Sequence, residues 1–131
     1  MKKSEATQHS KISAWIRYFM EKYEQNVKVE LKHSRGKTSM PYDCFEEHQL
    51  PDLISFQNGA AFIYKFPDTG YERKPVDFLG ARGGVSFVAV RFPKVITIIN
   101  IDRWLAEEAK LERKSITVER AEEIAFQIIK I

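Results

Sequence analysis

Apolar residues recur at spacings of three and four near the start of the chain. This period predicts an amphipathic helix over residues 4–25 with one buried stripe. The stripe consists of Ile12, Trp15, Ile16, Phe19, Met20 and Tyr23. Residues 27–31 then alternate between apolar and polar side chains, which predicts a short, half-exposed strand.

The stretch of residues 42–58 predicts a second helix of about a dozen residues. Asp43 is a suitable N-cap, and Asn58-Gly59 is a stop signal. Pro51 either kinks this helix or starts its second part, because a proline lacks the N–H that a helix interior needs.

Short apolar runs bounded by turn residues follow, and they predict strands. The runs cover residues 60–66, 76–81, 85–92 and 95–101. Gly83 and Gly84 can adopt the positive φ angles of a tight turn, so we expect residues 76–81 and 85–92 to form a hairpin.

Two closing helices are predicted over residues 102–111 and 117–131, with Asp102 and Thr117 as their caps and residues 112–115 as a linker. Helices and strands are segregated along the chain, which indicates an α+β fold. We expect a single domain over residues 1–131, with a small mixed β-sheet flanked by helices.

The net charge, the cysteine content and the lengths of the apolar runs limit the classes of protein to which this chain can belong. The net charge of +3 permits a nucleic-acid partner, and the one cysteine, Cys44, excludes an internal disulfide or a zinc site built from cysteines. No apolar run is long enough to span a membrane, and no secretory signal begins the chain. We therefore expect a cytoplasmic protein without a membrane partner.

Two charged residues stand out in the predicted hairpin. Asp77 interrupts one apolar strand and Arg91 lies at the end of the next. A carboxylate in an apolar strand must be exposed, hydrogen-bonded or bound to a cation, whereas Arg91 is also explained as a strand-end arginine that reaches solvent. Side by side, Asp77 and Arg91 could hold a metal ion and stabilise the charge that develops on a phosphodiester.

The segment from Lys74 to Phe92 resembles the PD-(D/E)XK nuclease superfamily, and within it the Holliday-junction resolvase-like group. In that superfamily an Asp starts the second core strand, and Glu-x-Lys follows on the third. Counted from Asp77, the motif falls on Ala89-Val90-Arg91, so an alanine replaces the metal-binding glutamate and an arginine replaces the lysine. The resemblance implies a restriction-endonuclease-like core and a Mg²⁺- or Mn²⁺-dependent endodeoxyribonuclease (a hydrolase).

A carboxylate from elsewhere would have to fill the place that Ala89 leaves. The first candidate is Glu47, followed by Glu46, Asp68 and Glu5. Each of them also has an ordinary explanation as surface charge, turn residue or helix first turn. We therefore predict Asp77, Glu47 and Asp68 as metal ligands. Asp77, Arg91, Glu47 and Gln49 form the predicted catalytic set, with Gln49 orienting water or contacting phosphate.

Basic residues suggest where DNA would bind. Several precede or flank Gly36, in a loop that could contact phosphates or could be merely solvated. Lys65 is also a candidate to replace the missing motif lysine. The predicted DNA-binding residues are Lys32, Arg35, Lys37, Lys65 and Lys74.

Three functions remain open. The first is a nuclease-like protein acting on branched or duplex DNA, for which the resemblance implies a homodimer because a four-way junction has two-fold symmetry. The second is a catalytically inactive module on the same fold that binds DNA or a protein partner. The third is an interaction protein whose likeness to nucleases is accidental.

Overall fold

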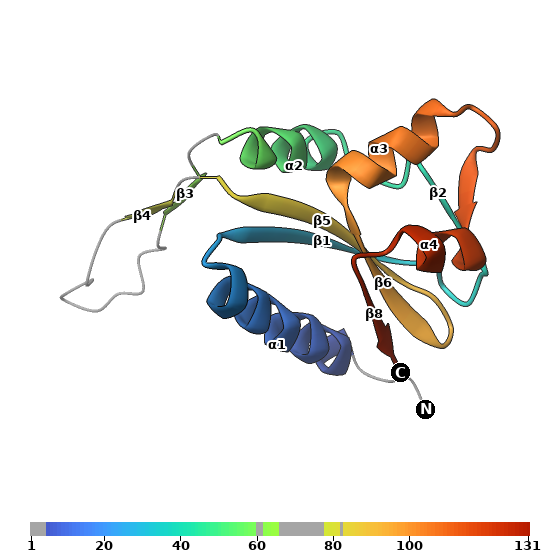
Figure 1. Ribbon diagram of the computed structural model, residues 1–131, viewed down its shortest axis with the longest axis horizontal. Coiled ribbons are helices and arrows are strands. Elements are labelled where there is room, and N and C mark those ends of the chain that lie inside the picture. Colours follow the sequence, from blue (N-terminus) through green and yellow to red (C-terminus); the bar gives the residue numbers. More distant parts are fainter. Residues whose placement is uncertain (1–4, 60–61, 66–77, 82) are drawn as a thin grey trace.

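A computed structural model of the protein describes residues 5–59, 62–65, 78–81 and 83–131 (Figure 1). The side chains of residues 5–9, 62–65 and 78–81 are not part of this description. The elements follow in the order α1 (Glu5–Tyr23), β1 (Val27–His33), β2 (Ser39–Pro41), α2 (Gln49–Gln57), β3 (Phe62–Lys65), β4 (Phe78–Ala81), β5 (Val85–Arg91), β6 (Val95–Asn100), α3 (Ile101–Ala109), β7 (Ser115–Thr117), α4 (Val118–Ile124) and β8 (Gln127–Lys130). The fold is α+β, as the segregated pattern predicts.

The central sheet has four strands in the order β1-β5-β6-β8. β1 runs parallel to β5, with Val27 opposite Val85 and His33 opposite Arg91. β6 is antiparallel to both β5 and β8. The sheet is therefore mixed, and β1 lies at one edge of it.

Helices cover both faces of this sheet. In Figure 1, α1 lies on one face and α2 and α3 lie on the other. Trp15 and Phe19 of α1 pack against Phe87 and Ala89 of β5, which confirms their predicted burial. Ile16 is only half-buried, whereas Met20 and Tyr23 are exposed at 39% and 43%.

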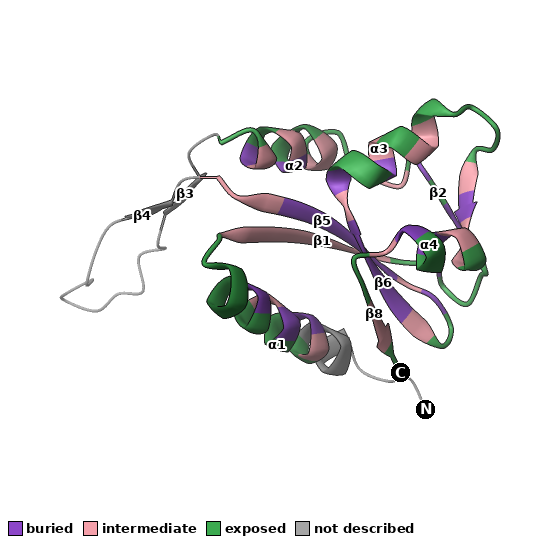
Figure 2. Cartoon of the chain, in the orientation of Figure 1, coloured by how far each residue is buried: buried purple, intermediate pink, exposed green. Residues whose placement is uncertain are grey.

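β5 is the buried centre of the sheet and β1 is its half-buried border, as Figure 2 shows. On the side opposite α1, Val88 and Val90 of β5 pack with Leu53 of α2 and Trp104 of α3. Side chains alternate along β5, so one strand supplies both cores.

The second helix is shorter than expected. α2 begins at Gln49, with Glu47 and His48 in the preceding turn, so Asp43 is not its N-cap. Pro51 lies in the first turn of α2, where the missing N–H breaks no helical hydrogen bond. Pro51 therefore does not start a second part of the helix, because α2 begins two residues before it, at Gln49.

The expected hairpin between residues 76–81 and 85–92 is not formed. β4 pairs with β3, and β5 pairs with β1 and β6. Gly83 and Gly84 instead allow close backbone approach: a Cβ on Gly83 would lie 1.9 Å from the Phe56 carbonyl oxygen, and one on Gly84 would lie 2.0 Å from that of Asn26. The two glycines thus lock the start of β5 between the end of α2 and the start of β1.

The C-terminal helix is also shorter than the apolar period indicates. Thr117 caps α4 as expected, but the backbone turns extended at Ala125. The remaining isoleucine-rich residues form β8 on the edge of β6, because β-branched side chains suit a half-buried sheet surface.

Two smaller differences concern caps and linkers. The side chain of Asn100, and not that of Asp102, caps α3 by accepting a hydrogen bond from the Asp102 N–H. The expected linker contributes Ser115 to β7, which pairs with β2 in a small antiparallel sheet. Within the described part of the chain, no helix is long and apolar enough to cross a membrane.

Candidate functional site

Glu30 and Lys32 lie on the same face of β1. Val29 and Leu31, the other residues of this stretch, pack into the core under α1. Because side chains alternate along a strand, Glu30 and Lys32 point to the opposite side of the sheet, toward α2. The side chains are 28% and 14% exposed, and the Lys32 Nζ lies 3.8 Å from the Glu30 Oε1. A carboxylate and an ammonium group are thus held together on a strand at the border of the sheet.

The side chain of Gln49 joins these two residues. Its Oε1 accepts hydrogen bonds from the Lys32 Nζ at 2.5 Å and from the Glu46 backbone N–H at 2.9 Å. Its Nε2 donates to the Glu30 Oε1 at 2.9 Å. Because the lysine and the backbone N–H can only donate, the orientation of the amide is determined by its partners. We call these three residues the Glu30–Lys32–Gln49 cluster.

The segment before α2 forms a wall beside this cluster. The Lys32 Nζ lies 5.6 Å from the centre of the Phe45 ring, within the range of a cation–π interaction. Phe45 in turn packs edge-on against Trp104, with ring centres 5.8 Å apart. Burial raises the pKa of the neighbouring Cys44 thiol to about 11, so this side chain is neutral near pH 7.

A tight turn with two basic side chains follows β1. The Ser34 N–H donates to the Arg91 carbonyl oxygen, which ends the pairing of β1 with β5. Arg35 and Gly36 have φ angles of +57° and +83°, and the Lys37 N–H donates back to the Ser34 carbonyl oxygen. Arg35 and Lys37 are exposed. The turn of residues 34–37, which we call the basic turn, therefore presents both cations to solvent at the end of the strand that carries Lys32.

The structure separates Arg91 from this cluster. Phe87 and Ala89 pack under α1, so alternation places Arg91 on the face opposite Glu30 and Lys32. The guanidinium Nη1 donates to the Phe92 carbonyl oxygen at the end of β5. Ala89 is fully buried in the apolar core under α1, so the position that the motif assigns to a glutamate is not part of a polar site here.

The other predicted site residues have different outcomes. Gln49 belongs to the cluster, whereas Glu46 and Glu47 are exposed in the turn before α2, where only the backbone of Glu46 touches Gln49. Lys65 ends β3 and Glu5 begins α1, but their side chains lie outside the description. Three further predicted residues lie outside the described residues altogether: Asp68, Lys74 and Asp77.

The sequence analysis missed Glu30, and it took Lys32 only as a DNA contact. The signal was present, because Glu30-Leu31-Lys32 reads Glu-x-Lys on a predicted strand. Counting forward from Asp77 places the motif on Ala89-Val90-Arg91 instead. Leu31 lies directly opposite Ala89 in the parallel pair, so the Glu-x-Lys tripeptide lies on the strand next to the one expected to carry it.

The cluster offers one carboxylate for a metal ion. Among the described residues, no group of three acidic, histidine or cysteine side chains could hold one. Mg²⁺ is commonly bound through one or two carboxylates together with water and substrate phosphates. Glu30 therefore fits one ligand of such an ion, and a complete site needs further oxygen atoms.

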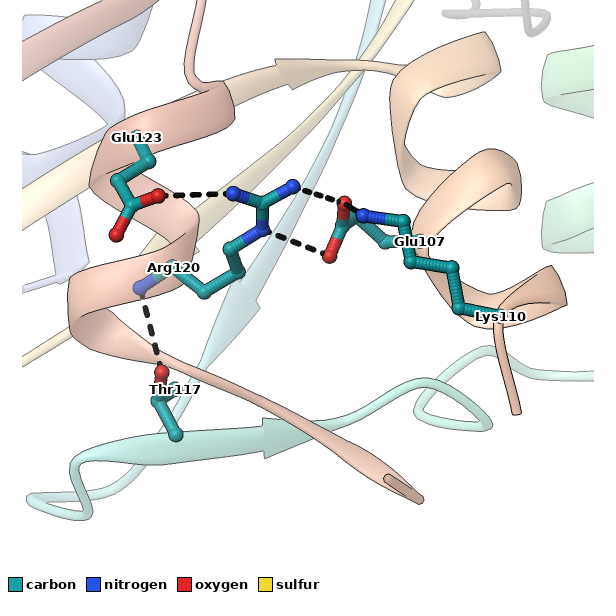
Figure 3. A network of polar contacts seen from close by, with 5 residues as sticks. All are labelled: Glu107, Lys110, Thr117, Arg120 and Glu123. Carbon is teal, nitrogen blue, oxygen red and sulfur yellow. Dashed lines mark hydrogen bonds and ion pairs between the residues drawn. The ribbon is translucent and has the colours of Figure 1, made fainter. Parts of the chain in front are cut away.

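A second polar network lies between α3 and α4. Figure 3 shows the Arg120 guanidinium between Glu107 and Glu123, with Lys110 on the far side of Glu107. The hydrogen bonds from Arg120, aided by Lys110, lower the pKa of Glu107 to about 2. A cavity of about 420 Å³ beside it is lined by Tyr42, Glu107, Lys110, Glu112, Arg113, Ser115, Ile116, Thr117 and Arg120. Glu107 and Glu123, the two carboxylates of this network, are both paired with cations. We therefore interpret the network as a structural link between α3 and α4.

Comparisons with known proteins add no family to this picture. A scan against protein-family models and a search of curated proteins gave no significant match to the chain.

Proposed function

We propose that this protein is a nuclease-like protein that acts on DNA, with its active site at the Glu30–Lys32–Gln49 cluster. The observation that supports this proposal is the Glu-x-Lys tripeptide on β1, held by a glutamine from the adjacent helix. The PD-(D/E)XK superfamily carries the same tripeptide on the third core strand of a restriction-endonuclease-like fold, whereas here it lies on β1, the first strand of the chain. The mixed sheet flanked by helices is consistent with such a core.

The chemistry of the three side chains suits hydrolysis of a phosphodiester. Lys32 would donate hydrogen bonds to the oxygens on which negative charge builds up in the transition state. Glu30 would be one ligand of a Mg²⁺ or Mn²⁺ ion, which would polarise the phosphate and activate water. Gln49 holds both side chains in place, so neither needs to reorganise far.

A second carboxylate would complete the metal site. The resemblance names Asp77 as a metal ligand, but Asp77 lies outside the described residues, and β4, which follows it, leads to Gly83 at the end of α2 opposite Gln49. Glu47 is exposed in the turn before α2, and the described contacts of the cluster do not include it. Its side chain would have to turn toward Glu30.

DNA would approach along β1 toward the basic turn. Arg35 and Lys37 are exposed beside the end of the strand that carries Lys32, and cations placed in this way neutralise phosphates. Branched or duplex DNA and a homodimer remain part of the proposal, as the resemblance implies.

The second candidate function is a nuclease-shaped module that binds DNA without cutting it. One observation favours it: Gln49 already satisfies both Glu30 and Lys32, and the cluster has a single carboxylate among the residues that the structure covers. In such a module Lys32 and the basic turn would still contact phosphates.

A cleavage assay with Mn²⁺ on a four-way junction and on linear duplex tests the first candidate. Wild type should cut at least one substrate, while Glu30→Gln and Lys32→Met should each lose about a hundredfold or more in rate. Asp52→Asn is the matched control, because it removes an exposed carboxylate from the first turn of the same helix and should cut normally.

Two results would decide against the enzyme. Cleavage that persists in Glu30→Gln would show that the active site lies elsewhere. No cleavage by wild type, together with DNA binding that weakens steeply from low to physiological salt, would favour the binding module.

A further inference from the structure

α2 is attached to the sheet at both of its ends. Gln49 at its N-terminal end bonds to β1, and Gln57 at its C-terminal end bonds to β5 and β6. Nine helical residues span roughly 13 Å, so the second attachment lies well away from the candidate site.

The distal attachment is a compact polar network. The Gln57 Oε1 accepts hydrogen bonds from the Ser86 N–H at 3.2 Å and from the Asn100 Nδ2 at 2.8 Å. Asn100 Nδ2 also lies 3.3 Å from the Ser86 carbonyl oxygen, and the Ser86 hydroxyl donates to the Leu53 carbonyl oxygen at 2.6 Å. We call these three side chains the Gln57–Ser86–Asn100 network.

Apolar packing contributes to the attachment of α2 without giving it a direction. Leu53 and Phe56 are buried beneath the helix, and the hydrophobic contacts that they make are non-directional. Hydrogen bonds are directional, and Ser86 is fully buried, so breaking them would leave unsatisfied polar groups. Together with the hydrogen bond from the Gly84 N–H to the Phe56 carbonyl oxygen, the network therefore restricts the translation and rotation of α2.

We infer that Gln57, Ser86 and Asn100 are positioning residues that set the place of Gln49 between Glu30 and Lys32. None of them touches the cluster, and they act through the rigid body of α2. The functional consequence rests on the proposed function, whereas the geometric one does not.

Two substitutions separate this role from others. Gln57→Glu keeps an acceptor for both hydrogen bonds, whereas Gln57→Leu removes it with little change in size. Asn100→Asp keeps the cap on α3, because its oxygen still accepts from the Asp102 N–H, but it loses the donor to Gln57.

The test follows the side-chain amide signals of Gln49 by NMR in ¹⁵N-labelled full-length protein, assigned by their loss in Gln49→Leu. Gln57→Leu and Asn100→Asp should shift these signals toward those of a water-exposed glutamine, and Gln57→Glu should leave them in place. Ile98→Val is the control, because it weakens the core under α1 without touching α2.

Unchanged Gln49 signals in Asn100→Asp and Gln57→Leu would overturn the inference, as would an equal shift in Ile98→Val. Should Gln57→Leu fail to fold, Asn100→Asp alone decides. If wild type cuts DNA, Gln57→Leu should also lower kcat by about tenfold to a hundredfold with KM nearly unchanged, and Gln57→Glu should restore it. If wild type does not cut, the NMR result still stands by itself.

Discussion

The Nζ of Lys32 lies 2.5 Å from the Oε1 of Gln49, and this contact joins the edge strand β1 to the start of α2. The two residues are separated in the chain by the basic turn and by β2. The same amide binds Glu30 through its nitrogen, so one neutral side chain satisfies a cation and an anion at once.

This geometry makes Gln49→Glu an informative substitution. A glutamate there still accepts from Lys32, but it replaces a donor with a second carboxylate facing Glu30. If the cluster binds metal, the extra ligand should strengthen Mn²⁺ binding by about tenfold, which stabilises the folded state by up to about 1.4 kcal/mol more than in wild type.

The measurement is the rise in melting temperature on adding Mn²⁺. The double variant Glu30→Gln with Gln49→Glu is the control, because it restores a single carboxylate and should lose the gain. An equal rise in both variants would show that the ion binds outside the cluster.

Phe19 should carry a large share of the stability of α1. It is 4% exposed and packs against Trp15 and Phe87 with ring centres 5.2 Å and 5.3 Å away. Phe19→Ala should lower the free energy of unfolding by about 3–5 kcal/mol in urea denaturation. Tyr18→Ala, one residue away and 52% exposed, should lower it by less than about 1 kcal/mol. A small effect of Phe19→Ala would mean that α1 does not pack on the sheet in solution.

Gly84 and Gly36 should respond differently to alanine. A Cβ on Gly84 would lie 2.0 Å from the backbone oxygen of Asn26, and the backbone must shift to relieve it, so Gly84→Ala should cost about 3 kcal/mol or more. Gly36 has open space around it and a φ of +83°, so Gly36→Ala should cost only the backbone strain of about 1–2 kcal/mol. Equal losses in thermal unfolding would contradict the close approach at Gly84.

The link between α3 and α4 should respond to acid. Arg120 lowers the pKa of Glu107 from an ordinary 4.5 to about 2, so the folded protein holds this carboxylate ionised where the unfolded chain would protonate it. The stabilisation is fully present above pH 4.5 and is lost as the pH falls through 4.5 toward 2. The melting temperature of wild type should therefore fall more steeply over this window than that of Glu107→Gln. Glu122→Gln, an exposed carboxylate on α4, should keep the slope of wild type.

The predictable parts of the fold were those with long, local patterns. α1 was correct because its stripe repeats over several turns, and β5 and β6 were correct because apolar runs bounded by turn residues leave few alternatives. β8 was missed because residues 118–131 also fit a helical period, and only pairing with β6 decides between the two. Tertiary contacts overrode the local pattern there.

The candidate site shows the same limit. Gln49 was singled out from the sequence, but Glu30 was not, because its relation to Gln49 arises from the packing of α2 on β1 and from the parallel pairing of β1 with β5. The assumption of a hairpin between neighbouring segments directed attention to Ala89 and Arg91. A parallel pair cannot be predicted from neighbouring segments of the sequence, because its two strands are distant from each other along the chain.

The parallel pairing also sets the order in which the molecule should assemble. β5 and β6 are joined by a short turn and can form a hairpin within microseconds, whereas β1 can join β5 only after the long intervening chain has closed into a loop. The Glu30–Lys32–Gln49 cluster should therefore form late in folding and be lost early in unfolding. In hydrogen exchange, the amides of β1 should open before those of β5 and β6, so that any activity disappears while the centre of the sheet is still intact.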